Sequence, residues 1–288
     1  MKAKEEMFGT VPKVDIWILL EYNQAWGEKA FPSSNIPKNV KKRLSNYVES
    51  TPYCRLQLIK RHDRSLDSIK LYLGVSDEKE PKLFELNLSS YDDLLEIDIP
   101  KILESSSFLR KEPLILICTH GTHDKCCSKF GVPIYLKAIE QENRFATWQC
   151  THLGGHRFAA NVLCLPHGIY YGRVREKGNL CEVIKEYQNR SVHLENYRGR
   201  SCYHNEVQAA EYFLRMQTGI KEISAFCLNE TKNNDRGGAM VEFLSATNGE
   251  IHFFYIQTDK NAMSNYTSCK DKDKSSISQY RLVNYKKI

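Results

Sequence analysis

Cysteine and histidine side chains that could bind a metal are concentrated between residues 118 and 167. Half of the chain's ten cysteines lie there, together with several of its nine histidines. Cys118 and Cys127 are nine residues apart, and His152 and His156 are four residues apart within the sequence HLGGH. Two thiolates and two imidazoles suit either a tetrahedral zinc ion or an iron-sulfur cluster, and the ligand types alone do not separate the two.

The two glycines of HLGGH change how its histidines are interpreted. A spacing of four residues places two histidines on one helix face in zinc proteases. Gly154 and Gly155 disfavour a helix here by about 1 kcal/mol each relative to alanine, and Leu153 stands where such a site needs glutamate. We therefore expect a tight loop, in which the glycines let the backbone approach a bulky inorganic group and both imidazoles point inward.

The cysteine spacing favours a cluster over a zinc ion. Zinc modules commonly use a short C-x2-4-C loop, and the nine-residue step from Cys118 to Cys127 is too wide for that pattern. Rieske centres also use two cysteines and two histidines, but their motifs combine one cysteine with one histidine on each loop. Here the cysteines and the histidines form separate pairs, so the pattern is not Rieske-like.

The stretch ICTHGTHDKCCSKFG, followed by WQCTHLGGHRFAANVLCLPHGIYYGRV, resembles the sucrase/ferredoxin-like family. GTVPKVDIWILLEYNQAWG near the N-terminus also resembles the opening of that family, and TSC at residues 267–269 is a looser match. The resemblance implies a thioredoxin-like 2Fe-2S ferredoxin. Its implied ligands are one cysteine pair for one iron and one histidine pair for the other: Cys118 and Cys127, then His152 and His156.

Cys126 is the rival ligand, because it is adjacent to Cys127 and can be reached from the same loop. The resemblance favours Cys127, since it places the second ligand nine residues after the first. Several residues near the ligands could set the polarity of the site or contact a partner, or could simply be solvated loop residues: Asp124, Gly154, Gly155, Arg157 and Arg173.

The remaining cysteines and the nearby histidines are interpreted as structural. Cys150 and Cys164 lie in apolar stretches and are expected to be small buried side chains. Five further cysteines show no metal-ligand spacing and are expected to be structural thiols: Cys54, Cys181, Cys202, Cys227 and Cys269. His120 and His123 lie in the cysteine loop, but no spacing pairs them with the HLGGH histidines, so we do not expect them to bind the metal.

The implied ligand set predicts electron transfer with a raised reduction potential. Two neutral imidazoles in place of thiolates make a cluster less negative, and His-ligated Rieske centres reach ~-150 to +300 mV against ~-400 mV for plant-type ferredoxins. The second imidazole nitrogen could exchange a proton with solvent, so the potential should depend on pH. We expect an electron carrier or redox sensor rather than an enzyme, with an unidentified reductase or flavodoxin-like protein as partner. No carboxylate pair supports a sucrase activity.

Two other functions are compatible with the same residues. A thiol-disulfide redox protein on a thioredoxin-like fold could use Cys127 with Cys118 or Cys126 as its dithiol, although the sequence has no C-x-x-C motif. A structural zinc protein could serve as an interaction module. The colour and the metal content of the purified protein would separate these alternatives.

Composition places the chain among ordinary globular proteins. Of its 288 residues, 41% are hydrophobic and 26% charged, and the net charge of +6 is too small to indicate nucleic-acid binding. The longest apolar runs, residues 16–20 and 114–118, are far shorter than the ~20 residues of a membrane-spanning helix. The charged N-terminus has no secretory signal, and ten cysteines are too few for a disulfide framework. We therefore expect thiols in the cytoplasm, without nucleic-acid or membrane partners.

The elements that must position these residues form an α/β pattern in three segments. We predict an N-terminal α/β segment, residues 1–110, that could be a degenerate thioredoxin-like domain; the ferredoxin segment, residues 111–220; and a β-rich segment, residues 221–288. Strands are predicted at residues 14–20, 54–60, 69–75, 82–88, 114–118, 145–151, 168–174, 223–228, 239–244, 251–257 and 280–285. Helices are predicted at 37–48, 91–103, 126–141, 183–190 and 205–218, and polar loops at 229–238 and 258–278. The ligand pairs should converge, because each follows the carboxyl end of a strand.

Overall fold

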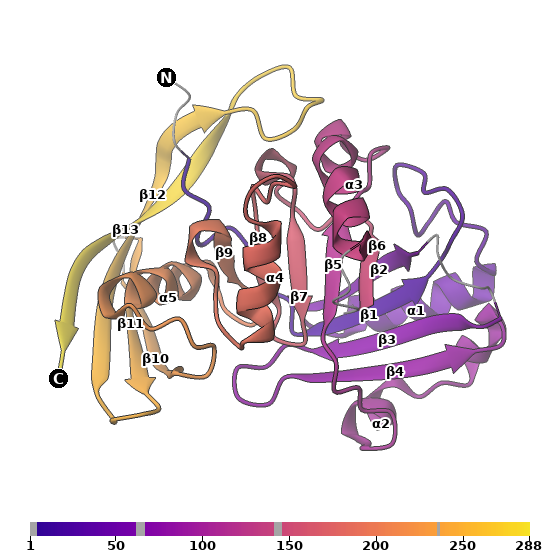
Figure 1. Ribbon diagram of the computed structural model, residues 1–288, viewed down its shortest axis with the longest axis horizontal. Helices are drawn as coiled ribbons and strands as arrows, with labels where there is room; N and C mark the ends of the chain where they lie inside the picture. Colours follow the sequence, from indigo (N-terminus) through magenta and orange to yellow (C-terminus); the bar gives the residue numbers. More distant parts are fainter. Residues whose placement is uncertain (1–4, 62–66, 141–145, 235–236) are drawn as a thin grey trace.

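The computed structural model describes residues 5–61, 67–140, 146–234 and 237–288 (Figure 1). A nine-stranded mixed sheet has the order β4-β3-β1-β2-β6-β5-β7-β8-β9, and a separate antiparallel sheet has the order β10-β11-β12-β13. This arrangement confirms the predicted α/β class with a β-rich C-terminal segment. The last residue of the predicted helix 126–141, the first residue of the predicted strand 145–151, and residues 235–236 of the predicted loop 229–238 lie outside the described residues. Within the described ranges, no helix is both long and apolar enough to cross a membrane.

The first half of the large sheet is built from four strands. They are β1 (Ile16–Glu21), β2 (Cys54–Lys60), β3 (Ile69–Val75) and β4 (Lys82–Leu88), with α1 (Lys38–Ser50) between the first two, and the 3-10 helix η1 (Tyr91–Leu95) and α2 (Ile99–Glu104) after the last. β1 is parallel to β2 and antiparallel to β3, and β3 is antiparallel to β4.

The second half repeats this order and pairing. Its elements are β5 (Leu114–Cys118), α3 (Lys125–Glu140), β6 (Ala146–Cys150), η2 (His156–Phe158), β7 (Val162–Leu165), β8 (Ile169–Tyr171), α4 (Leu180–Gln188), η3 (Leu194–Asn196) and β9 (Tyr197–Arg200). β5 is parallel to β6 and antiparallel to β7, and β7 is antiparallel to β8. The halves join where β2 and β6 pair antiparallel, with Ile59 opposite Cys150.

Alternation along the central strands sends side chains into different core clusters. In β5, every residue of LILIC is buried, as expected for a strand covered on both faces. Ile115 and Ile117 pack with α3 and α4, whereas Leu114 and Leu116 join a cluster that also contains Trp17 of the first half. The two halves therefore share one apolar core in addition to their common sheet.

The C-terminal sheet packs against α5 (Asn205–Thr218) and extends back toward the large sheet. Its strands are β10 (Phe226–Asn234), β11 (Gly238–Ser245), β12 (Ile251–Asn265) and β13 (Ser275–Lys287). Ala210 and Leu214 of α5 lie in one core cluster with Val241 and Phe254. Beyond this core, β12 and β13 continue as a long hairpin whose tip reaches across the top of the molecule toward α3 (Figure 1).

Several predicted elements differ from the structure. The predicted polar loops 229–238 and 258–278 are largely strand, because polar residues here pair through their backbones and remain exposed. The predicted helix 91–103 is interrupted before Ile99, where Asp98 caps α2 by accepting a hydrogen bond from the Lys101 backbone. β7 and β9 are unpredicted strands; β9 contains two buried arginines in YRGR, so no apolar run marks it in the sequence.

Candidate metal centre

The two predicted cysteine ligands lie where β5 meets α3. Cys118 is the last residue of β5, and Cys127 lies in the first turn of α3. Each has a relative exposure of 1%. Gly131 allows this close approach, because a Cβ atom at that position would overlap the carbonyl oxygen of Cys118. The helix thus brings the second thiol back onto the end of the strand.

The two predicted histidine ligands lie in the loop after β6, and His152 faces the cysteines. His152 Nδ1 is 3.5 Å from Cys127 Sγ, and His152 Nε2 is 3.4 Å from His156 Nδ1. The potential ligand atoms of Cys118, Cys127 and His152 all lie within 4.8 Å of one another. Both histidines are half-buried, whereas both cysteines are buried. The structure therefore groups Cys118, Cys127 and His152, while His156 lies beside His152 and is grouped with His152 and His123 rather than with the cysteines.

A buried arginine holds the HLGGH loop in its turn. Gly154 and Gly155 have positive φ values of 95° and 69°, which fits the predicted tight loop. Arg198 Nη1 donates to the Gly154 carbonyl at 3.1 Å and to Asn161 Oδ1 at 2.8 Å. Asn161 Nδ2 in turn donates to the Gly155 carbonyl at 2.9 Å. This buried network is what fixes the loop that carries the histidines.

Gly155→Ala should destabilise the protein by about 1–3 kcal/mol, because it puts a side chain in a strained backbone region and its Cβ would lie 2.5 Å from Arg198 Nη2. Gly219→Ala is the matched control, since its φ is +71° and nothing lies within 4 Å of the added Cβ. Urea unfolding of both variants should show the larger loss for Gly155→Ala. Equal losses would mean that the contact with Arg198 is unimportant.

The first half of the sheet also holds the histidine loop, through β2. Arg55 Nη2 donates to the His152 carbonyl at 2.6 Å, and Arg55 Nη1 donates to the Leu153 carbonyl at 3.2 Å. Gln57 Nε2 adds a 3.3 Å contact to the His152 carbonyl. Sequence reasoning did not find Arg55 or Gln57, because they lie almost a hundred residues before the loop.

Two further histidines of the cysteine loop lie against His152. His120 Nδ1 accepts a 3.3 Å hydrogen bond from the His152 backbone, while its Nε2 lies 2.8 Å from the Gly27 carbonyl. The His123 ring stacks on the His152 ring with centroids 4.1 Å apart. Burial lowers the pKa of both His120 and His123, which favours their neutral form. Neither contact follows from the sequence spacing.

The flanking residues named from the sequence have different surroundings. Asp124 is buried, and its Oδ2 lies 3.8 Å from His156 Nε2. Burial alone would raise the Asp124 pKa, but hydrogen bonds, the first from the Cys126 backbone, outweigh it and lower the pKa. Arg157 and Arg173 instead bind the N-terminal segment: Arg157 Nε donates to Glu5 Oε1 at 2.6 Å, and Arg173 Nη2 donates to the Glu5 carbonyl at 2.8 Å.

Comparison with known proteins connects this geometry to a family. Residues 7–199, which contain both halves of the large sheet and all four predicted ligands, match the sucrase/ferredoxin-like family. The chain belongs to this family.

A curated protein to which this chain is similar is "Altered inheritance of mitochondria protein 32" of Meyerozyma guilliermondii. It is 38% identical over 72 residues, which cover 22% of this chain and 26% of that protein. The matched part is thus about a quarter of the relative's length. No solved structure matches the chain.

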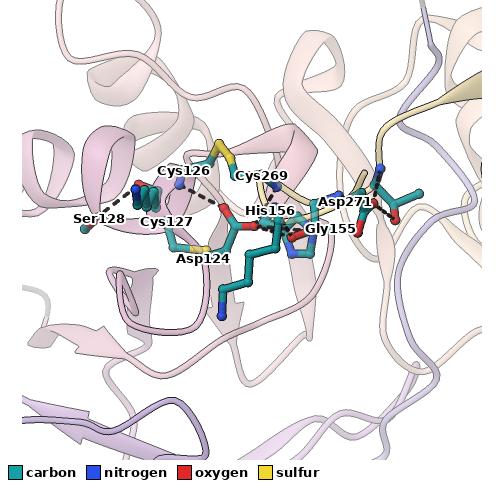
Figure 2. Close-up of a disulfide and its surroundings, with 12 residues drawn as sticks. Asp124, Cys126, Cys127, Ser128, Gly155, His156, Cys269 and Asp271 are labelled. Atoms are coloured by element: carbon teal, nitrogen blue, oxygen red, sulfur yellow. Dashed lines mark hydrogen bonds and ion pairs between the residues drawn. A yellow bond between two sulfur atoms is a disulfide. The ribbon is translucent and has the colours of Figure 1, made fainter. Parts of the chain in front are cut away.

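The sucrase/ferredoxin-like match ends before the C-terminal sheet, yet that sheet contributes a cysteine beside the site. Cys126 and Cys269 form a disulfide, with a sequence separation of 143 residues (Figure 2). The prediction that both are free thiols is therefore wrong. The weak TSC match at residues 267–269 was the only sequence signal that singled out Cys269.

The free cysteines of this family member differ in their surroundings. A hydrogen bond from Cys127 and the nearby His152 lower the pKa of the Cys118 thiol, while the proton shared with Cys118 raises the pKa of Cys127. Cys150 and Cys164 are fully buried, which confirms the prediction for both, and burial raises their pKa values. The lowered pKa singles out Cys118 as the thiol that is most easily ionised among these four.

Proposed function

We propose that this protein is an electron-transfer protein that holds one 2Fe-2S cluster. Cys118 and Cys127 would bind one iron, and His152 and His156 the other. The observation that carries the proposal is the convergence of these side chains, in which His152 lies within 3.5 Å of Cys127 and 3.4 Å of His156. Their residue types are those that hold iron-sulfur centres with mixed ligation.

The donor atoms fit such a group. His156 Nε2 is buried and has no hydrogen-bond partner within the part of the chain that the structure describes. His152 directs one ring nitrogen at a thiol and the other at His156. Buried ring nitrogens usually have a hydrogen-bond partner, so His156 Nε2 is suited to metal ligation, and the His152 nitrogens already point at other potential ligands. When bound, the cluster supplies reversible one-electron transfer.

The surrounding residues would hold the ligands and limit the access of water. Burial of Cys118 and Cys127 keeps solvent from the thiols, while Arg55 and Arg198 fix the backbone of the histidine loop from two sides. The half-buried histidines form the side nearest to solvent. Electrons would therefore pass to a reductase or flavodoxin-like partner across the histidine side.

The strand order is compatible with the thioredoxin-like fold that the family resemblance implies. Each half of the large sheet has the order strand, helix, strand, strand, strand, with a parallel first pair and antiparallel pairs after it. Among the residues that the structure describes, the groups of cysteine and histidine ligands lie in the second half of the large sheet, so we propose one cluster per chain. The expected cytoplasmic location stays a prediction.

The test is the colour and metal content of protein purified without oxygen. A red-brown protein with visible absorbance and about two iron and two acid-labile sulfide ions per chain would support the proposal. A colourless protein that contains stoichiometric zinc would instead make Cys118, Cys127 and His152 a zinc site, and the electron-transfer proposal would be wrong.

The reduction potential should also fall as pH rises. A ligand imidazole that loses its second proton in the oxidised state regains it on reduction, because the added electron raises its pKa. Between the pKa of the oxidised form and the higher pKa of the reduced form, the potential would fall by up to about 59 mV per pH unit, which corresponds to one proton per electron. Film voltammetry between about pH 6 and 10 measures this slope. A flat potential over that range would contradict coupling to the histidines.

A further inference from the structure

The Cys126–Cys269 disulfide lies at a surface pocket beside the candidate centre. The pocket has a volume of about 380 Å³, and its lining includes both cysteines, His156, Arg157 and Tyr266. Cys269 is exposed, whereas Cys126 is half-buried in the first turn of α3. A nucleophile arriving from solvent therefore meets Cys269 Sγ first. Accessible disulfides of this kind are the ones that exchange readily.

We propose that this disulfide is a thiol-disulfide exchange site whose substrate is a small thiol or dithiol. The thiolate of the reagent attacks Cys269 Sγ, the bond between the two protein sulfurs breaks, and Cys126 leaves as a thiolate that takes a proton from water. A second reagent thiol then attacks the mixed disulfide and releases Cys269 as a thiol. Two electrons pass from the reagent to the protein, and the reagent leaves as its own disulfide.

The disulfide is the strongest link between the hairpin tip and the site. The tip, residues 266–274, otherwise contacts the cysteine loop through polar groups: Ser268 Oγ and the Cys269 backbone donate to Asp124 Oδ2 at 2.8 and 3.0 Å. Lys270 Nζ forms a 2.6 Å ion pair with Glu28 Oε1, and both side chains are at least half exposed. The exposed ion pair adds little to this attachment, and once the tip lifts, water reaches the Asp124 carboxylate and replaces its two hydrogen bonds. Reduction should therefore release the tip.

Release of the tip would uncover the imidazole side of the site. Figure 2 shows the disulfide next to Asp124 and His156, and Asp124 is the residue that contacts both the tip and His156. In a compartment that thiols keep reduced, disulfides that form are usually transient and redox-responsive. The exchange chemistry does not depend on a cluster; only the effect on electron transfer rests on the proposed function.

The test uses the full-length protein in anaerobic glutathione buffers of graded reduced-to-oxidised ratio, followed by rapid alkylation and mass spectrometry of the cysteine peptides. We expect Cys126 and Cys269 to become alkylated together as the buffer becomes more reducing, with a glutathione adduct at Cys269 in the intermediate range. Hydrogen exchange of residues 266–274 should rise at least tenfold over the same range.

Two variants make the result interpretable. In the Cys269→Ser protein, Cys126 should be alkylated without any reductant, and residues 266–274 should show fast hydrogen exchange at every ratio of reduced to oxidised glutathione. Cys181→Ser, which removes an exposed cysteine outside the disulfide, should behave like the unmodified protein. Alkylation of both cysteines before any reduction, or resistance of both until the protein unfolds, would overturn the proposal. Iron and sulfide are measured in the same samples. If the Cys126–Cys269 disulfide exchanges as expected but no cluster is present, only the proposed function is contradicted.

Discussion

Cys118→Ser or Cys127→Ser is expected to remove most of the iron and the visible absorbance. Serine is protonated at neutral pH and is a poor replacement for a thiolate. Both positions are 1% exposed, so solvent cannot easily supply another ligand. Because changes to residues that only hydrogen-bond to a metal ligand commonly cost about 10- to 100-fold in metal affinity, loss of a ligand itself should lower bound iron by at least about tenfold.

The matched control for these variants is Cys164→Ser. Cys164 is also fully buried and free, but it lies in the other core cluster, with Ile115 and Ile117. The Cys164→Ser protein should be less stable, because it buries a hydroxyl group, but it should retain its iron. Iron and sulfide assays on folded protein, checked by circular dichroism, separate the two effects. Full iron content in Cys118→Ser or Cys127→Ser would exclude the proposed ligand pair.

His152→Cys and His156→Cys should keep a cluster and lower its reduction potential. Each change replaces a neutral imidazole by an anionic thiolate, which stabilises the oxidised form. The double variant should approach the potential of all-cysteine ferredoxins, a decrease on the order of a few hundred mV. A redox titration followed by electron paramagnetic resonance measures the shift, and the pH dependence should disappear with the imidazoles.

His123→Ala is the matched control for the histidine variants. The potential ligand atoms of His123, His152 and His156 lie within 4.8 Å of one another, so His123 is the histidine that could bind in place of His156. We expect His123→Ala to keep the cluster and its pH dependence. Loss of the cluster in this variant, with retention in His156→Ala, would show that the ligand assignment is wrong.

The candidate site was partly predictable because its main residues follow strands that the sequence marks clearly. The buried run LILIC ends at Cys118, and the glycines between His152 and His156 predict a turn with positive φ. The supporting residues were not predictable, because their contacts span large sequence distances. Arg55 belongs to the other half of the sheet, and Arg198 lies in a short strand that no apolar run marks in the sequence.

The fold was predictable where hydrophobic periodicity dominates and not where pairing is mainly polar. The strands of both halves of the large sheet carry apolar runs, and most were found at nearly their observed positions. The β12–β13 hairpin is exposed and polar beyond its first residues, so backbone pairing rather than burial defines it. Without that hairpin, the sequence offered no reason to place Cys269 beside Cys126.

The β2–β6 seam restricts how this protein could be shortened or recombined. Among the described residues, Ile59 and Lys60 pair across it, opposite Cys150 and Gln149, and the residues that follow β6 lead directly into the histidine loop. A fragment without the first half would leave β6 as an open edge and the carbonyl of His152 without its arginine donor. We therefore expect that the second half cannot be transferred alone to another protein, because the first half supports the backbone of its histidine loop.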